Sequence, residues 1–481
     1  MLSTASMLGL FAVTWLVVWR WLEGHRTANL PPGPKALPLI GNLFDITFKE
    51  LWVRAASWAE QYGDVVYLRV FGQGILFLNS YEVAVDVLEK RGVAYADKPR
   101  MVMCTELCGC ENITPFVRYG ELLRRHRRLM HSAIGPANIS AYHALMKRET
   151  CAFLKRLVES PDDYRSHIRR FIGSQTLSII YGYRVATDDD PHLKRAAETL
   201  DLLSNHIASA GAGLWLVDIF PPLRYLPSWF PGAGFKRQAA DWKARIEECA
   251  DAPYQRVKEE MERGTATPCY CTMLLGTAAD AKDELDIKWT ASTMYIGQTL
   301  TALCQFILAM IQYPSVMRRA QDEIDVLTGG KRLPTHEDRQ LLPYVGALMK
   351  ECLRWAAPVP LSLPHSVMED DVYAGMHIPK GTLAFANVWE MSRNPDIFPN
   401  ADEFRPERYL EEVDEEMAKK RDPKSFVFGF GRRRCPGIHL ADSSLWIAIA
   451  CMLATFDFSK AKDAHGDVLE PLPAYNDASF L

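Results

Sequence analysis

The sequence has little that would divide it into domains or direct it to nucleic acid. After residue 35, no Gly/Ser-rich linker, repeated segment or shift of composition interrupts the chain of 481 residues. Its 55 Lys and Arg residues are outnumbered by 59 Asp and Glu residues, which leaves a net charge of -4. Binding to nucleic acid requires a basic surplus. We therefore expect one large catalytic domain and no nucleic-acid partner.

The eleven cysteines lack the regular spacing of a secreted disulfide framework. Their odd number and scattered positions favour a reducing compartment. Two C-x-C pairs, Cys108 with Cys110 and Cys269 with Cys271, raise the alternative of a four-thiolate zinc site. Ordinary reduced cysteines are the favoured interpretation, because C-x-C is a tighter spacing than zinc sites usually have.

Charged side chains are absent from Met1–Trp19. As a helix this run would extend about 28 Å, close to the apolar thickness of a bilayer. Arg20 and Arg26 follow the run, whereas a cleaved signal peptide carries its basic residues before the apolar run. The pattern predicts an uncleaved anchor with the bulk of the protein in the cytosol. A buried core helix of a soluble protein is the alternative.

A proline cluster, Pro31-Pro32-Gly33-Pro34, follows the anchor and predicts a stiff, non-helical spacer. We divide the chain into a transmembrane anchor over residues 1–22, a hinge over residues 23–34 and a catalytic domain over residues 35–481.

Most of the catalytic domain has helical periodicity. Helices are predicted over Pro314–Thr328 and over the apolar stretch from Met294 to Met310. Strand-like segments are few, and Val65–Phe71 and Ile75–Asn79 flank Gly72-Gln73-Gly74 in a predicted hairpin. The predicted fold class is mainly α with small β regions near each end.

Near the carboxyl end, the segment Phe428–Gly437 reads F-G-F-G-R-R-R-C-P-G and precedes an apolar helix that begins at about Ile438. Gly429 and Gly431 permit tight bends and a close approach to a flat cofactor. Arg433 supplies a fixed positive charge for a carboxylate. This combination indicates a loop built to hold a cofactor.

Cys435 lies just before the amino terminus of that helix, where negative charge is stabilised. We expect this position to lower the pKa of the thiol and to favour the thiolate that binds metals. A structural, buried free cysteine is the alternative for any lone cysteine.

The whole string matches F-x-x-G-x-R-x-C-x-G, and in it the chain resembles the cytochrome P450 family. The resemblance implies the cytochrome P450 fold, a single domain that encloses haem b. It implies that Cys435 is the iron ligand and that Phe428, Gly429 and Arg433 lie against the cofactor.

Two further motifs extend the resemblance. Glu351 and Arg354 form E-x-x-R, and Arg408 follows in P-E-R-Y. The resemblance implies a Glu–Arg–Arg network that locks the loop before the cysteine. The alternative for an isolated E-x-x-R is a solvated surface pair.

Arg127 matches the family arginine that pairs with a haem propionate, and His365 lies where members place another propionate partner. Leu123 replaces the tryptophan of the family motif W-x-x-x-R, which removes one hydrogen-bond donor. Neighbouring arginines also suit a membrane or the acidic surface of a reductase: Arg124, Arg125 and Arg128.

One expected motif is missing. Most family members carry an acid and an alcohol on the helix over the haem, for proton delivery. Here Gly297 and Gln298 occupy those positions, and about three preceding residues are absent. Thr299 and Thr301 are the remaining catalytic candidates, although a role in helix packing is an equal alternative. The gap reflects an error in the gene model, a proton relay by the substrate, or a haem reaction other than oxygen insertion.

The resemblance implies a monooxygenase of the endoplasmic reticulum membrane that receives electrons from NADPH–cytochrome P450 reductase. Sequence details resemble fungal members of secondary metabolism, so we expect a small apolar substrate of terpenoid or indole type. Two alternatives remain because the acid–alcohol pair is missing. These are a haem-thiolate isomerase or dehydratase, and a haem-binding remnant without activity.

Overall fold

A computed structural model describes residues 29–46, 49–207, 215–297, 300–463 and 465–471. The predicted anchor and the hinge up to residue 28 lie outside these residues. The rest of the hinge lies against the first strand, because the Tyr67 N–H donates to the Pro32 carbonyl oxygen at 2.9 Å. A Cβ added to Gly33 would come within 2.1 Å of the Tyr67 carbonyl oxygen, so only glycine permits this approach.

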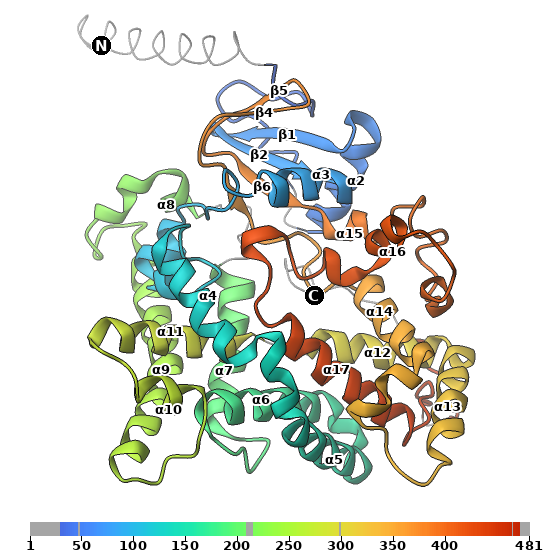
Figure 1. Ribbon diagram of the computed structural model, residues 1–481. Helices are drawn as coiled ribbons and strands as arrows, with labels where there is room; N and C mark the ends of the chain where they lie inside the picture. Colours follow the sequence, from blue (N-terminus) through green and yellow to red (C-terminus); the bar gives the residue numbers. More distant parts are fainter. Residues whose placement is uncertain (1–28, 47–48, 208–214, 298–299, 464, 472–481) are drawn as a thin grey trace, which may run out of the picture.

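Segments that are distant in the sequence meet in one sheet at the end of the molecule that carries α2 (Leu51–Tyr62) and α3 (Tyr81–Val85) (Figure 1). Its strand order is β1-β2-β6-β3. The strands are β1 (Val65–Val70), β2 (Gln73–Leu78), β3 (His365–Ser366) and β6 (Leu383–Ala386). β6 runs parallel to β2, and β3 pairs antiparallel with β6. A second sheet pairs β4 (Asp371–Tyr373) with β5 (Met376–Ile378).

The predicted hairpin of β1 and β2 is confirmed, but its turn was misplaced. Val70 pairs with Gln73, so the turn consists of Phe71 and Gly72, and Gln73 belongs to β2. Both turn residues have positive φ, 47° and 85°. Two-residue turns of this kind match the twist of the flanking strands, which explains why the turn is shorter than the predicted Gly72-Gln73-Gly74.

Helices form most of the rest of the structure, as predicted. In chain order they are α2 (Leu51–Tyr62), α3 (Tyr81–Val85), α4 (Glu121–Ile134), α5 (His143–Glu159), α6 (Tyr164–Tyr181), α7 (Pro191–Asp201), α8 (Leu216–Ile219), α9 (Gly234–Glu262), α10 (Tyr270–Leu275), α11 (Ala281–Ile296), α12 (Leu300–Gln312), α13 (Pro314–Thr328), α14 (Pro343–Trp355), α15 (Val388–Met391), α16 (Glu415–Arg421) and α17 (Ile438–Leu453). The predicted bounds of α13 are confirmed.

The helix predicted over the apolar stretch from Met294 to Met310 is confirmed for most of its residues, which belong to α11 and α12. α11 ends at Ile296, Gly297 adopts an extended conformation with ψ 117°, and α12 begins at Leu300. Glycine is the least costly residue at which to leave a helix, because it is also the least stable ordinary residue within one.

Together, Ala281–Gln312 are long and apolar enough to cross a membrane, with a mean hydropathy of 1.5, although the stretch runs over residues 298–299, which are not described. In the most apolar part, 53% of the residues are buried within the protein. Core helices of soluble proteins pass the same test, so the stretch is only weak evidence of membrane association.

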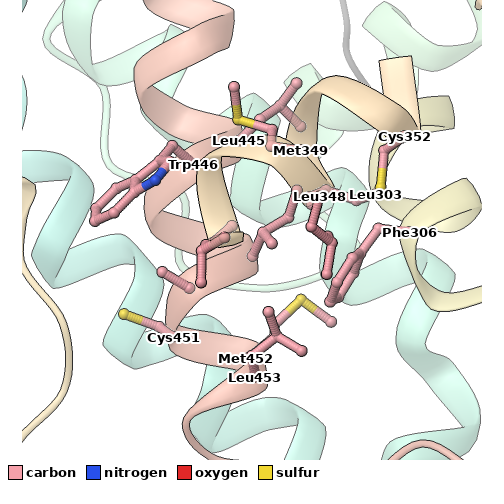
Figure 2. Packing of buried hydrophobic residues seen from close by; sticks show 14 of the residues in the cluster. Leu303, Phe306, Leu348, Met349, Cys352, Leu445, Trp446, Cys451, Met452 and Leu453 are labelled. Carbon is pink, nitrogen blue, oxygen red and sulfur yellow. The ribbon is translucent and has the colours of Figure 1, made fainter. Parts of the chain in front are cut away.

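A hydrophobic cluster holds α17 in place behind the cysteine loop. Figure 2 shows side chains of α12, α14 and α17 packed together, among them Phe306, Leu348 and Trp446. Trp446 has no exposed surface, and every residue from Ser443 to Leu453 is buried. Because interiors are close-packed, this contact fixes the position at which α17 begins and hence that of the loop before it.

Candidate functional site

The loop that carries Cys435 is closed by its own backbone. The Cys435 N–H donates to the Phe428 carbonyl oxygen at 2.8 Å. Gly429 and Gly431 both have positive φ, 75° and 50°, as the tight bends require. A Cβ on Gly431 would come within 2.4 Å of the Leu88 carbonyl oxygen, so glycine is needed there for packing as well.

Cys435 has an accessible side chain, yet burial raises the pKa of its thiol. The thiol is thus accessible at its surface but closely surrounded by protein. A hydrogen bond from the Gly437 N–H and the charge of Arg127 lower the pKa without cancelling the effect of burial. The predicted net lowering of the thiol pKa is therefore wrong for the protein alone. α17 begins only at Ile438, and the helix-terminus effect fades within a turn.

Arg127 on α4 points toward the same loop. Its Nη1 donates to the Arg434 carbonyl oxygen at 2.8 Å, and burial lowers the pKa of its guanidinium while Cys435 raises it. Leu123, one turn earlier, is 1% exposed and fills its position with apolar bulk.

The predicted basic face of α4 is smaller than expected. Arg124 and Arg128 are exposed. Arg125 instead forms an ion pair with Asp286 of α11, and its side chain is only 21% exposed. The buried carboxylate of Asp286 has drawn this cation inward, so the exposed cations on α4 are Arg124 and Arg128.

The side chains of Arg433 and His365 contact the backbone of two consecutive residues, Ala96 and Tyr95. The Arg433 Nε donates to the Ala96 carbonyl oxygen at 2.6 Å, and the His365 Nδ1 contacts the Tyr95 carbonyl oxygen at 2.7 Å. Both terminal nitrogens of Arg433 are buried without a partner among the described residues, and burial lowers the pKa of the guanidinium to about 10. The fold thus leaves two charged donors of Arg433 unsatisfied.

Lys98 joins this group and was missed in the sequence. It is 4% exposed, and its Nζ donates to the carbonyl oxygens of Leu363 and Pro364 at 3.1 and 2.9 Å. A single lysine in a loop carries no motif. Only the return of the chain at Pro364-His365 places it beside Arg433.

Little negative charge balances these cations. Asp97 accepts hydrogen bonds from Arg118 and from the Tyr119 N–H, which hold the pKa of its carboxyl below the usual value against the effect of burial. Among the described residues, no ion pair joins a carboxylate to Lys98, Arg127 or Arg433. Buried charges are normally paired, so this cluster fits an anionic group from outside the chain.

The residues present therefore fit haem. Its two carboxylates would satisfy the open donors of Arg433 and its neighbours, and the accessible thiol of Cys435 would meet the iron.

Within the described residues, no group of three or more His, Cys, Asp or Glu side chains is arranged to hold a metal ion, which disfavours the zinc alternative.

Glu351, Arg354 and Arg408 form a buried network. Arg354 donates two hydrogen bonds of 2.8 Å to the Glu351 carboxylate, and the Arg408 Nε donates a third at 3.1 Å. Tyr409 adds a fourth at 3.1 Å. Arg354 also donates to the Ser392 carbonyl oxygen at 2.9 Å, which ties α14 to the chain that leads to the cysteine loop. These residues are fully buried, so the alternative of a solvated pair is wrong.

Of the two predicted proton-delivering residues, Thr301 alone lies within the described part of the chain. Thr299 and Gln298 lie outside the described residues. Thr301, in the first turn of α12, is partly buried, and Gly297 is exposed. α12 contains no carboxylate. The break between α11 and α12 thus lies where the acid and alcohol of the family are absent.

Comparisons with known proteins agree over nearly the whole chain. Residues 31–472 match the family model for cytochrome P450. Cytochrome P450 monooxygenase 176 of Postia placenta is 38% identical over 467 residues, which cover 95% of this chain and 89% of that protein. Cytochrome P450 monooxygenase claT of Ampulloclitocybe clavipes is 37% identical over 478 residues, 97% of this chain and 93% of that protein. Tryptamine 4-monooxygenase of Psilocybe cyanescens is 39% identical over 468 residues, 95% of this chain and 91% of that protein.

We expect Glu351→Gln to lower the free energy of unfolding by about 3–5 kcal/mol, because two buried guanidiniums lose their charged partner. Urea denaturation followed by circular dichroism measures the change. Glu412→Gln, at an exposed position, is the matched control. Equal midpoints for the two variants would contradict the assigned role of the network.

Proposed function

Because this chain belongs to the cytochrome P450 family, we propose that it is a membrane-anchored haem-thiolate monooxygenase that oxidises a small apolar secondary metabolite. Members of the family bind haem and are oxidoreductases that need a redox partner and a small substrate. The observation that supports the assignment of the site is the half-buried Arg433, whose two terminal nitrogens are buried without a partner among the described residues, in the loop that carries the accessible thiol of Cys435.

In this proposal Cys435 ligates the iron, and Arg433, Arg127 and His365 bind the carboxylates, with Phe428 and Gly429 beside the cofactor. When bound, haem supplies the activation of dioxygen and the transfer of one oxygen atom to a C–H bond. The chain contributes a Gly437 N–H that donates to the ligand sulfur, and this tunes the electron density on it. The network of Glu351, Arg354 and Arg408 keeps the loop from shifting.

The remaining hydroxyls near the helix break, Thr299 and Thr301, are the proposed proton-transfer groups. A hydroxyl both donates and accepts, so either can hold a water, but neither supplies a proton as a carboxylic acid does. This favours a second candidate function, a haem-thiolate isomerase or dehydratase that needs no electrons. A haem-binding remnant without activity is the third.

The proposed electron donor is NADPH–cytochrome P450 reductase. Arg124 and Arg128, one turn apart on the exposed side of α4, offer positive charge to an acidic partner. They share the helix with Arg127, so a protein bound there lies close to the cysteine loop. The relative named tryptamine 4-monooxygenase makes an indole a reasonable first substrate class, with terpenoids as the second.

We also propose that residues 1–22 anchor the enzyme in the endoplasmic reticulum membrane, followed by a hinge up to residue 34 and a catalytic domain from residue 35 that faces the cytosol. The described chain just beyond the hinge exposes large apolar side chains, Leu39 at 60% and Phe44 at 78%. Phe71 contacts Phe220 with ring centroids 6.2 Å apart, and Trp229 is 77% exposed. Exposed apolar groups near an anchor suit the lipid interface.

For the ligand, we expect Cys435→Ser to abolish the thiolate-type spectrum of the reduced carbon monoxide complex, because a serine hydroxyl does not donate electrons to iron as a thiolate does. Difference spectroscopy of the full chain measures it. Cys151→Ser, at an exposed cysteine, should leave the spectrum unchanged. Survival of the spectrum in Cys435→Ser would exclude this cysteine as the ligand.

For the reaction, the full chain with a fungal reductase should convert one of a panel of terpenoids and indoles to a product that carries an atom from ¹⁸O₂, and only with NADPH. Mass spectrometry measures the incorporation. Unlabelled product formed without NADPH would establish the isomerase or dehydratase. An intact carbon monoxide spectrum without any product would favour the remnant.

For the membrane, brominated phospholipids should quench part of the tryptophan fluorescence of the full chain in vesicles, and Trp229→Phe should reduce that part, because the lipid interface covers Trp229. Replacement of a fully buried tryptophan, Trp446→Phe, is the control and should leave the quenched part unchanged. An equal quenched part before and after Trp229→Phe would place this side chain outside the lipid.

A further inference from the structure

The cations beside the cysteine loop differ in whether they can release a proton. Arg127 and Arg433 remain charged at any physiological pH. Lys98 and His365 are titratable, and both are nearly completely buried, at 4% and 5% exposure. The cluster therefore holds two charges that are permanent and two that depend on the surroundings.

Lys98 has no carboxylate to stabilise its ammonium form. Two of its three N–H donors reach backbone carbonyls, those of Leu363 and Pro364, which leaves a third. The nearby carboxylate of Asp97 is bound by Arg118. Burial and the charge of Arg433 lower the pKa of Lys98 well below its usual value, and Asp97 only partly opposes them.

His365 is held in one tautomer. A carbonyl oxygen cannot donate, so the contact of 2.7 Å between the His365 Nδ1 and the Tyr95 carbonyl oxygen places a proton on Nδ1. In the neutral ring, Nε2 is then bare, and no hydrogen bond to it occurs among the described residues. Burial, Lys98 and Arg433 lower the pKa of this ring, while the Tyr95 carbonyl raises it.

From this juxtaposition of two permanent and two titratable cations without a carboxylate of their own, we infer that haem binding by this chain is coupled to proton uptake at Lys98 and His365. The inference rests on the proposed haem site. The two carboxylates of haem bring the negative charge that the cluster lacks. Each carboxylate then favours the charged forms of Lys98 and His365. The Lys98 ammonium donates its third N–H to a carboxylate, and the His365 imidazolium donates from Nε2.

The sign of the pH dependence follows from these directions. The pKa values of both groups are depressed without haem and rise when its carboxylates arrive. The contribution of these two groups to haem affinity is therefore greatest below the depressed pKa values and is lost as the pH rises from those values to the values of the loaded protein. The loss is up to about tenfold per pH unit for each group that takes up a whole proton. An ammonium group ordinarily has a higher pKa than an imidazolium, so the contribution of Lys98 extends to higher pH than that of His365.

Ligation by Cys435 releases a proton from its thiol, which opposes the uptake. Haem dimethyl ester separates the two effects, because its esters carry no charge while its iron still takes the thiolate. The proton count for haem minus the count for the ester therefore reports the carboxylate-linked uptake alone.

The experiment titrates the apo form of the full chain, in detergent, with haem and with haem dimethyl ester. Isothermal calorimetry in two buffers of different ionisation enthalpy yields the number of protons exchanged. We expect the chain to take up more protons when it binds haem than when it binds the ester. The expected difference is up to about two protons between pH 6 and 9. Lys98→Arg, which fixes the charge, should remove about one of them on the alkaline side. Lys236→Arg is the matched control, because the Lys236 Nζ also donates to two backbone carbonyls, at 2.9 and 2.8 Å, away from this cluster.

Equal proton counts for haem and its ester in the unmodified chain would overturn the inference, and this comparison requires no variant to fold. In that case a thiolate-type carbon monoxide spectrum would still uphold the proposed function. If the apo chain binds neither form of haem, the proposed function itself fails.

Discussion

When the chain folds, the guanidinium of Arg433 and the ammonium of Lys98 lose water, and no carboxylate of the chain replaces it. The cost of leaving such groups buried is several kcal/mol for each ion. The open donors of Arg433 and the depressed pKa values of Lys98 and His365 both reflect this one imbalance. In the proposed site the two carboxylates of haem would remove this imbalance, so binding of the cofactor would stabilise the fold.

A second buried charge cluster shows the contrast. Around Glu351, the guanidiniums of Arg354 and Arg408 have a carboxylate and backbone carbonyls within hydrogen-bond distance. The chain itself supplies the partners of these buried charges, so this cluster has a structural role. The cluster at Arg433 is incomplete. The difference between a structural and a binding role for buried arginines thus lies in which partners the chain supplies.

The protonation of the Cys435 thiol also depends on a balance between burial and neighbouring charge, but here the charged form is an anion. Burial favours the neutral thiol, while the Gly437 N–H and Arg127 favour the thiolate, and burial prevails in the protein alone. In the proposed haem site the iron would reverse this balance, because a thiol that coordinates a metal ion is deprotonated, with its proton released to solvent. The loop would position the sulfur, and the positive charge of the iron would favour the thiolate.

The sequence by itself determined the family, the helical class, the bounds of α13 and the bends at Gly429 and Gly431. These depend on periodicity and local backbone conformation, which neighbouring residues decide. Tertiary structure decided the rest: the two-residue hairpin turn, the helix break, the inward ion pair of Arg125, the place of Lys98 and the raised pKa of the Cys435 thiol. Each of these depends on burial or on a partner distant in the sequence. Desolvation and long-range contacts exist only once the chain has folded, so no local pattern records them.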